Sequence, residues 1–239
     1  MNSAIRVAGT LALLLVAGLL VGLTRPKGFS LRWLLIAAGL VGLNDFLLTR
    51  GFGLIPDFLP SAHWNWQGKI FALMATLVVA SLPQFGWRRS GLTVSQTHGS
   101  VKSCISVALA YCAFFVVMAF VFPDYERAST EAMGFQLSLP GLEEEPFYRG
   151  VLLLALDRAF AGRIKALGVK WGWGAVLSCA LFGLAHAFSY HHSHFGFDPL
   201  TMALTALPSF IAVWVRLRSG SVLIPVLLHN FGNSISMLV

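Results

Sequence analysis

The strongest constraint on this chain is a succession of apolar runs, several of them long enough to cross a lipid bilayer. A transmembrane helix needs about 20 predominantly apolar residues. Hydrophobic side chains make up 56% of the 239 residues and charged ones only 11%, whereas soluble domains contain roughly 25% charged residues. The sequence therefore predicts an all-α protein, a polytopic bundle of transmembrane helices in a lipid bilayer.

We expect about eight helices in a single membrane domain spanning 1–239, with N-terminal helices over 1–122 and a C-terminal core over 140–238. The first run has the length of a signal peptide, but no small-x-small cleavage site precedes Arg25, which favours a retained helix. The segment 123–140 is expected to lie in the interface or to form a partial re-entrant turn. The expected helices cover 5–23, 31–48, 70–85, 101–122, from the glutamates near 143 to about 160, 171–190, 200–215 and 222–238.

The basic residues alternate between the two sides of this predicted bundle. Twelve Lys and Arg fall in the connections after the first, third, fifth and seventh segments, and four fall on the opposite side. Because Lys and Arg in short loops stay cytoplasmic, both termini should face out of the cytoplasm. The net charge of +7 is explained by this bias, so no nucleic-acid partner is expected.

Three consecutive glutamates, Glu143, Glu144 and Glu145, stand at the head of an apolar helix. A charge at membrane depth costs several kcal/mol unless it is paired or hydrated. The chain has only 10 acidic residues, so this stretch is the leading candidate for a functional centre.

Three polar pairs recur in the last four segments, each with members four residues apart: Glu145 with Arg149, Phe182 with His186, and His229 with Asn233. Residues at this spacing lie on one face of a helix, so Glu145 and Arg149 can form an ion pair. In the predicted topology Glu144, His186, His229 and Asn233 all fall in the outer half of the membrane. Their agreement in depth predicts one shared site, although a single histidine on an apolar helix is more often a hydrogen-bonded core residue.

A glutamate, two imidazoles and an amide favour hydrolysis of a peptide bond by an activated water. A carboxylate in a partly desolvated pocket can act as a general base, and Asn and His donors can stabilise an oxyanion. The sequence has no Gly-x-Ser-x-Gly elbow, and its three cysteines lie within apolar segments without a matching base. A covalent nucleophile is therefore less favoured.

Taken together, Glu144-Glu145-x-x-x-Arg149, Phe182-x-x-x-His186 and His229-x-x-x-Asn233 resemble the three motifs of the CPBP family of intramembrane proteases, which includes the type II CAAX prenyl endopeptidases. The resemblance covers about residues 140–238. It implies that Glu144 is the base, that His186 helps to activate water and that His229 and Asn233 form the oxyanion hole. It also implies that Glu145 and Arg149 are a supporting pair.

We therefore expect a glutamate-type intramembrane endopeptidase, in a bacterial inner membrane, with its site on the extracytoplasmic side. A prenylated CAAX tail is made in the cytosol, so the outward site favours another substrate: a C-terminal sorting or membrane tail of an exported, membrane-anchored protein. The alternatives are CAAX-type processing of a lipidated tail and a non-proteolytic immunity or scaffold protein.

A metalloprotease is a further alternative, because His191, His192 and His194 have the composition of a metal-binding tract. The sequence contains no His-Glu-x-x-His, and the tract is expected in an outer loop. We therefore expect no metal and no other cofactor.

Overall fold

The computed structural model describes residues 2–122 and 128–238. Within these ranges the chain is mainly helical, and the π-helical turn η3 (Pro146–Leu152) joins two short helices into one continuous span over 139–159. The helices are α1 (Asn2–Thr24), α2 (Leu31–Thr49), α3 (Trp66–Ser81), α4 (Val101–Val121), α5 (Thr130–Gln136), α6 (Leu139–Glu145), α7 (Leu153–Ala159), α8 (Trp173–Ala187), α9 (Pro199–Ser219) and α10 (Leu223–Ser234).

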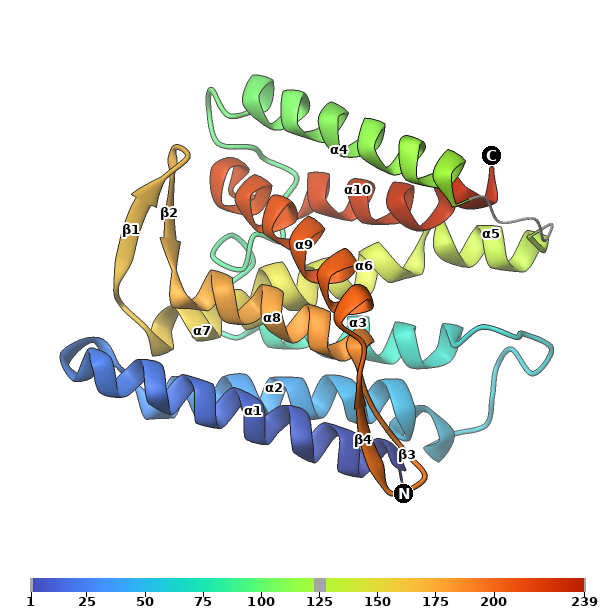
Figure 1. The fold of residues 1–239 in the computed structure, drawn as a ribbon, viewed down its shortest axis with the longest axis horizontal. Helices are drawn as coiled ribbons and strands as arrows, with labels where there is room; N and C mark the ends of the chain where they lie inside the picture. Colours follow the sequence, from blue (N-terminus) through green and yellow to red (C-terminus); the bar gives the residue numbers. More distant parts are fainter. Residues whose placement is uncertain (1, 123–127, 239) are drawn as a thin grey trace.

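The predicted all-α polytopic bundle is confirmed (Figure 1). Counting α6, η3 and α7 as one segment, the described residues form eight long helical segments in the predicted order, with α5 as an additional short helix. Four helices, α1, α2, α4 and α9, are long and apolar enough to cross a membrane.

Two β-hairpins were not predicted. Strands β1 (Arg163–Ala166) and β2 (Val169–Gly172) pair antiparallel before α8, and β3 (Phe188–His191) and β4 (His194–Phe197) pair antiparallel after it. The helix expected over 171–190 is therefore shorter at both ends. The second hairpin ends where Asp198 caps α9 by accepting hydrogen bonds from the backbone N–H groups of Leu200 and Thr201, an arrangement that fixes a helix start. His191, His192 and His194 surround the turn of the second hairpin.

The third segment also begins earlier than expected. Asn65 accepts a hydrogen bond from the backbone N–H of Gly68, and α3 starts at Trp66 instead of near residue 70. Lys69 consequently lies in the first turn of a helix and not in the connector where the sequence pattern places it. The Asn65 cap ends an aromatic connector that joins α2 to α3, and the hydrophilic residues of this connector conceal the helix start.

Part of the segment 123–140, including Asp124, Glu126 and Arg127, lies outside the described residues. The remainder contains α5, which Ser129 caps at its N-terminus. Glu131 of α5 accepts hydrogen bonds from the backbone N–H groups of His63 and Trp64 and from the indole of Trp66. This short helix therefore anchors the connector between α2 and α3.

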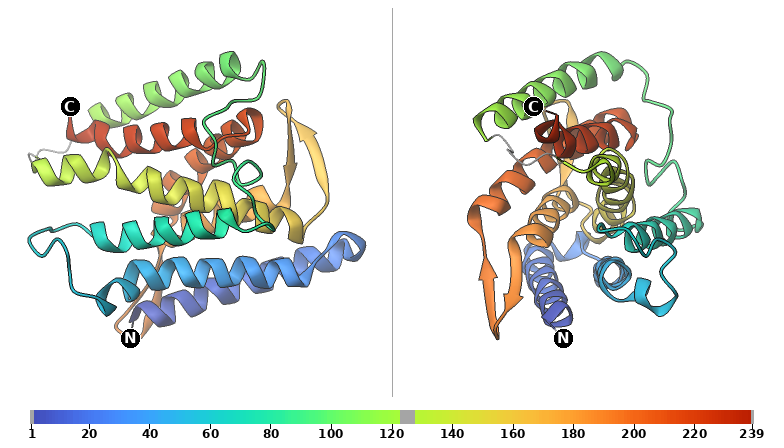
Figure 2. Two further views of the ribbon diagram at one scale, coloured as in Figure 1. Left: turned by 180° about the vertical axis from the view of Figure 1, so that it is seen from behind. Right: turned by 90° about the vertical axis from the view of Figure 1, so that its right-hand side faces the viewer.

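The span over 139–159 occupies the middle of the molecule, between α2 and α3 on one side and α8 and α10 on the other (Figure 2). Its apolar half supplies much of the core, because Val151, Leu152, Ala155 and Leu156 are fully buried. At the other end of the span every side chain from Pro146 to Gly150 is also buried. The glutamates thus stand at the head of the most enclosed helix of the bundle.

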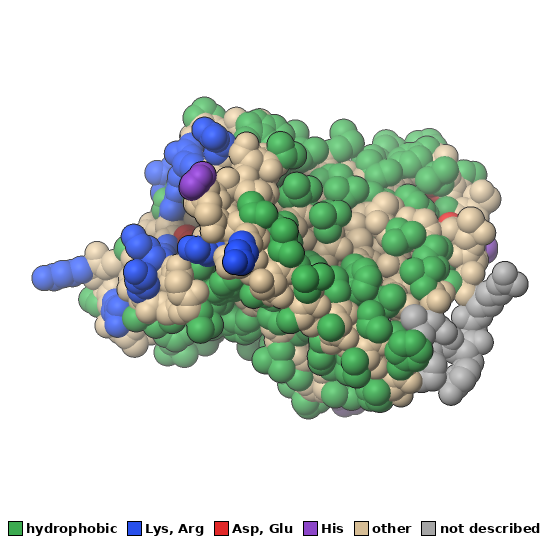
Figure 3. Space-filling view, turned by 90° about the horizontal axis from the view of Figure 1, so that it is seen from above, with side chains coloured by type: hydrophobic (Ala, Val, Ile, Leu, Met, Phe, Trp, Pro, Cys, Tyr) green, Lys and Arg blue, Asp and Glu red, His purple; other side chains and the backbone are tan. Residues whose placement is uncertain are grey.

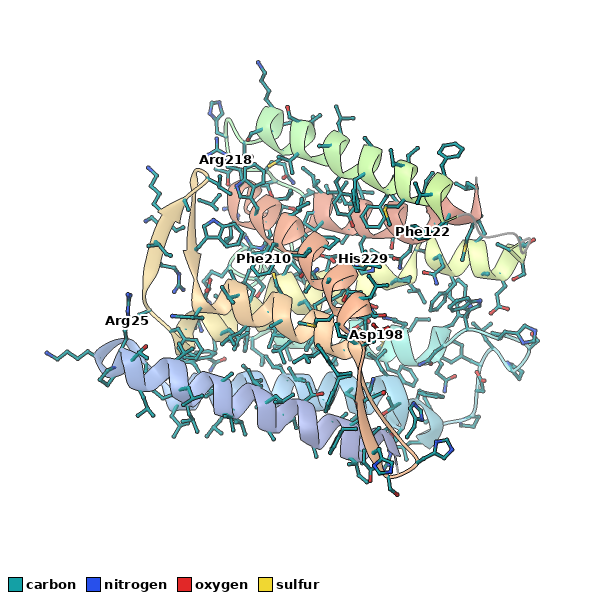
Figure 4. All side chains as sticks on the ribbon, viewed as in Figure 1. Arg25, Phe122, Asp198, Phe210, Arg218 and His229 are labelled. Carbon is teal, nitrogen blue, oxygen red and sulfur yellow. The ribbon has the colours of Figure 1, made fainter. Side chains whose placement is uncertain are left out.

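Charged residues are unevenly distributed along the bundle. Lys and Arg side chains gather at one end (Figure 3), the end where Arg25 and Arg218 lie (Figure 4). His229 and Asp198 lie toward the opposite half of the molecule (Figure 4). The basic end and the candidate site are therefore separated along the helix axes, as the alternation of charged loops predicts.

Candidate active site

The site begins with a proline that interrupts the central span. Pro146 has no backbone N–H and its ring disturbs the preceding turn, and the chain continues from it as the π turn η3. Such turns are frequent at functional sites. Ser178 of α8 donates a hydrogen bond of 2.7 Å to the carbonyl oxygen of Tyr148 within this turn, which ties the irregular backbone to the neighbouring helix.

Glu145 and Arg149 form the ion pair that their spacing predicts. Arg149 Nε lies 3.1 Å from Glu145 Oε2, and the two side chains are 2% and 1% exposed. Arg149 also donates a hydrogen bond of 3.0 Å to Ser209 Oγ of α9, and its guanidinium lies 4.2 Å from the centre of the Phe182 ring of α8. One arginine therefore joins the central span to two other helices.

Phe182 and His186 share a face of α8, and their ring centres are 4.8 Å apart. His186 Nδ1 lies 2.9 Å from the carbonyl oxygen of Phe182. A carbonyl can only accept, so Nδ1 carries a proton in this contact, and Nε2 is the nitrogen available to another partner. The Phe182 ring also meets His229 edge to face at 5.9 Å.

His229 of α10 connects two of the glutamates. Its Nδ1 lies 2.8 Å from Glu145 Oε1, and its Nε2 lies 3.7 Å from Glu144 Oε2. The first contact fixes the orientation of the imidazole, because a carboxylate accepts and Nδ1 must donate. Glu144 Oε2 is buried and has no hydrogen-bond partner among the described residues.

Asn233 stands one turn after His229 and donates a hydrogen bond of 3.0 Å to Gln136 Oε1 of α5. A second asparagine, Asn230, joins α10 to the start of the central span. Its Oδ1 accepts from the backbone N–H of Gly141 at 2.7 Å, and its Nδ2 donates to the carbonyl oxygen of Ser138 at 3.0 Å. The sequence analysis did not single out Gln136 or Asn230, because their partners are distant in the chain.

All six candidate residues line one cavity of about 250 Å³. Its other walls come from α4, α9 and α10, including Tyr111, Phe115 and Leu204. Four separate elements thus bring together the residues that the sequence placed at one depth, Glu144, His186, His229 and Asn233, with the predicted pair Glu145 and Arg149. Their catalytic roles stay predictions.

Lys69 is the component of the site that the sequence analysis missed. Its ammonium lies 2.6 Å from Glu143 Oε2 and 2.5 Å from Glu144 Oε1. The helix expected over 70–85 leaves Lys69 in the preceding connection, whereas the structure has it in the first turn of α3. A possible signal was that no other lysine stands between Lys27 and Lys102, so this one enters an apolar helix alone.

A second cavity, of about 170 Å³, lies on the other side of Glu144 and His186, which line both cavities. Lys69, Asn44 and the ion pair between Arg6 and Asp45 line this second cavity. Asp45, near the end of α2, thus contacts α1 through its ion pair with Arg6. The carboxylate of Glu144 therefore stands between two compartments.

No group of three or more His, Cys, Asp and Glu side chains suited to a metal ion occurs in 2–122 and 128–238. His191, His192 and His194 are exposed at the β3–β4 turn. The expectation that no metal is required stays a prediction, because it concerns the reaction and needs an assay.

Comparison with known proteins finds a matching family for the second half of the chain. Residues 129–235 match the model of the Rce1-like family, described as type II CAAX prenyl endopeptidase Rce1-like. The family resemblance carried by the three motifs is confirmed over this region. It implies a membrane-embedded peptide hydrolase. No curated protein and no solved structure matches the chain.

The matched region coincides with the part of the chain that supplies most of the site. It begins at the cap of α5, includes the central span and ends at the last turn of α10. The matched residues include all six candidate residues, whereas Lys69, which pairs with Glu143 and Glu144, lies outside them.

Proposed function

We propose that the protein is a glutamate-type intramembrane endopeptidase in which Glu144 activates the hydrolytic water. The observation that supports this most is Glu144 Oε2, a buried carboxylate oxygen without a hydrogen-bond partner that faces a cavity lined by two imidazoles and an amide. A buried acceptor left unpaired costs about 1–3 kcal/mol. A water molecule bound to this oxygen would remove that cost.

The proposed reaction is a general-base hydrolysis. Glu144 Oε2 takes a proton from the water, and the water oxygen attacks the carbonyl carbon of the scissile peptide bond. The tetrahedral intermediate then collapses, the carbon–nitrogen bond breaks, and the proton held by Glu144 passes to the leaving amine. His186 Nε2 is the second group that orients the water, because Nδ1 is occupied by the backbone of its own helix.

His229 and Asn233 are placed to stabilise the oxyanion. His229 Nδ1 already donates to Glu145, so a donor at Nε2 requires the imidazolium form. That form would balance the cluster, because within the described residues Glu143, Glu144 and Glu145 meet only Lys69 and Arg149 as permanent cations. Asn233 has a second amide N–H beyond the one that Gln136 accepts. Loss of one oxyanion donor costs about 2.7–4 kcal/mol in known hydrolases.

The substrate we propose is a protein with an apolar membrane tail. A further cavity of about 410 Å³ continues from the site between α4 and α9, sharing Phe115 and Leu204 with it. Its remaining walls are apolar except for Ser236, with Met118, Phe122 and Leu200 among them. Such a groove fits a hydrophobic peptide segment that enters sideways from the lipid.

The position of the site along the bundle supports an exported substrate. The basic residues mark the cytoplasmic end, and His229 and Asp198 lie toward the other half (Figure 4). We therefore propose that the enzyme acts from the extracytoplasmic side of a bacterial inner membrane and removes a C-terminal sorting tail. The Rce1-like match favours a second candidate, CAAX-type processing of a lipidated tail.

The proposal is tested with the protein reconstituted in lipid vesicles and two peptide substrates. One has an apolar C-terminal segment, and the other ends in a farnesylated CAAX sequence. Glu144→Gln should lower turnover by roughly 10²–10⁴-fold and leave the unfolding temperature and detergent behaviour unchanged. Addition of a chelator should leave the wild-type rate unchanged.

Cleavage of the farnesylated peptide alone would replace the sorting substrate with the CAAX substrate. Full turnover by Glu144→Gln would show that Glu144 is not the general base and would contradict the proposed mechanism. Inactivity of the wild-type protein toward both peptides, with function in cells unaffected by Glu144→Gln, would favour the scaffold alternative.

A further inference from the structure

Lys69 makes the most unexpected contact in the described residues. It projects from the first turn of α3 to two successive glutamates of α6, at 2.6 Å from Glu143 Oε2 and 2.5 Å from Glu144 Oε1. Its side chain is 13% exposed. A lysine this enclosed beside two carboxylates is retained only where the arrangement compensates for the loss of hydration.

The contact with Glu143 alone would compensate the charge of that carboxylate. Glu143 is completely buried and Lys69 is its only ion-pair partner in the described residues. A buried carboxylate needs one cation nearby, and a single contact would provide it. The second contact, with Glu144 Oε1, therefore has a consequence beyond neutralisation, because it fixes the orientation of the proposed catalytic carboxylate.

The orientation of the Glu144 carboxylate determines which of the two cavities its unpaired oxygen faces. Oε1 of Glu144 is held toward Lys69, which lines the cavity beside α1 and α2. Oε2 is left toward His229, which lines the cavity beside α9 and α10. A half-turn of the carboxylate only exchanges two equivalent oxygens, but without Lys69 its plane can also settle at intermediate angles, at which neither oxygen points at the water site in the substrate cavity.

We propose that Lys69 is a positioning residue for hydrolysis, holding Glu144 so that Oε2 alone faces the substrate cavity. This rests on the proposed role of Glu144 as general base. The proposal assigns a function to α3, a helix outside the Rce1-like region. Misplacement of a reacting group by about 1 Å can cost roughly 10²-fold in rate.

The charged groups around Glu144 come from every neighbouring element. Lys69 belongs to α3, and His186 and His229 belong to α8 and α10. Glu143 and Glu145 flank it on α6, with Arg149 in the following turn. A variant that removes Lys69 alone therefore changes both the balance of charge and the position of Glu144, and the experiment must separate the two effects.

A charge-conserving double variant separates them. Lys69→Met leaves Glu143 buried without a cation, and we expect it to unfold at lower temperature. Lys69→Met combined with Glu143→Gln removes one positive and one negative charge, and we expect it to recover the wild-type unfolding temperature. Its kcat on the apolar-tailed peptide should nevertheless stay about 10- to 100-fold below wild type, with KM within about twofold because the substrate groove is unaltered.

Glu143→Gln alone is the matched control. It keeps the contact between Lys69 and Glu144 and should retain kcat within about threefold, since the positioning contact is intact. Recovery of wild-type kcat by the double variant would overturn the proposal, because Lys69 would then only balance charge. An unchanged kcat in Lys69→Met would overturn it as well. Failure of the proposed function itself would be recognised separately, by full turnover in Glu144→Gln.

Discussion

Among single residues, Arg149 has the largest number of distinct contacts around the glutamates. It pairs with Glu145, donates to Ser209 and lies over the ring of Phe182. With only 2% of its side chain exposed, it has little access to water. The energetic value of such a residue appears on its removal, because the partner carboxylate is then left buried without a counter-charge.

Arg149→Met should lower the free energy of unfolding by about 3–5 kcal/mol. The methionine fills much of the space but cannot compensate Glu145. Arg50→Met is the matched control, because Arg50 is exposed and its change should cost less than about 1 kcal/mol. The measurement is denaturant unfolding in mixed micelles. Equal stability of the two variants would mean that the buried pair contributes nothing to the fold.

Contacts between single residues also show how much of the site could be predicted from the sequence. The pairing of Glu145 with Arg149 could be predicted because both stand on one helix, where spacing determines contact. The pairing of Lys69 with Glu144 could not, because it depends on how α3 packs against α6. The contact of Gln136 with Asn233 has the same origin. A sequence gives no distance between different helices.

Among elements, the contact between α6 and α10 sets the position of the glutamates. It depends on Gly141, whose backbone N–H is bonded to Asn230. A Cβ at Gly141 would lie 2.5 Å from Asn230 Oδ1 and 2.6 Å from the backbone oxygen of Val226. The second of these atoms cannot move independently of its helix, so the glycine is required for the close approach.

Gly141→Ala should therefore separate α6 from α10, destabilise the protein by about 1–3 kcal/mol and reduce turnover. Gly134→Ala is the control, because that glycine is an exposed position of α5 with nothing within 4 Å of the added Cβ. It should be neutral or stabilise by up to about 1 kcal/mol. Thermal unfolding and kcat of both variants provide the comparison. A Gly141→Ala protein as stable and active as wild type would contradict the tight contact.

The elements were predicted with uneven success, for physical reasons. Long apolar runs indicate helices directly, since a helix satisfies its backbone hydrogen bonds within a single segment inside lipid. The start of α3 at Trp66 was missed because its cap, Asn65, lies in an aromatic connector. The hairpins over 163–172 and 188–197 were missed because strands of four residues next to helices leave too short a pattern to recognise.

For the whole molecule, the basic end and the site end are the features that relate the fold to the membrane. Hairpins β1–β2 and β3–β4 precede and follow α8, so they lie at opposite ends of that helix. Lys165 of the first and His194 of the second are both exposed. These two positions report which end faces the cytoplasm.

In a background without the native cysteines Cys104, Cys112 and Cys179, His194→Cys should react with a membrane-impermeant maleimide on intact cells. Lys165→Cys should react only after the membrane is permeabilised, because the Lys- and Arg-rich end stays cytoplasmic. The reverse pattern would place the site at the inner face and favour a cytosolic CAAX-type substrate.

The measurement that tests the central claim most directly is a single turnover in water enriched in ¹⁸O, with the protein in excess over the apolar-tailed peptide. If Glu144 acts as a general base, the oxygen that attacks comes from solvent, and the new carboxylate of the first product contains one ¹⁸O atom. If the first product contains only ¹⁶O, that oxygen came from a protein carboxylate. Glu144 would then be a nucleophile, which contradicts the account.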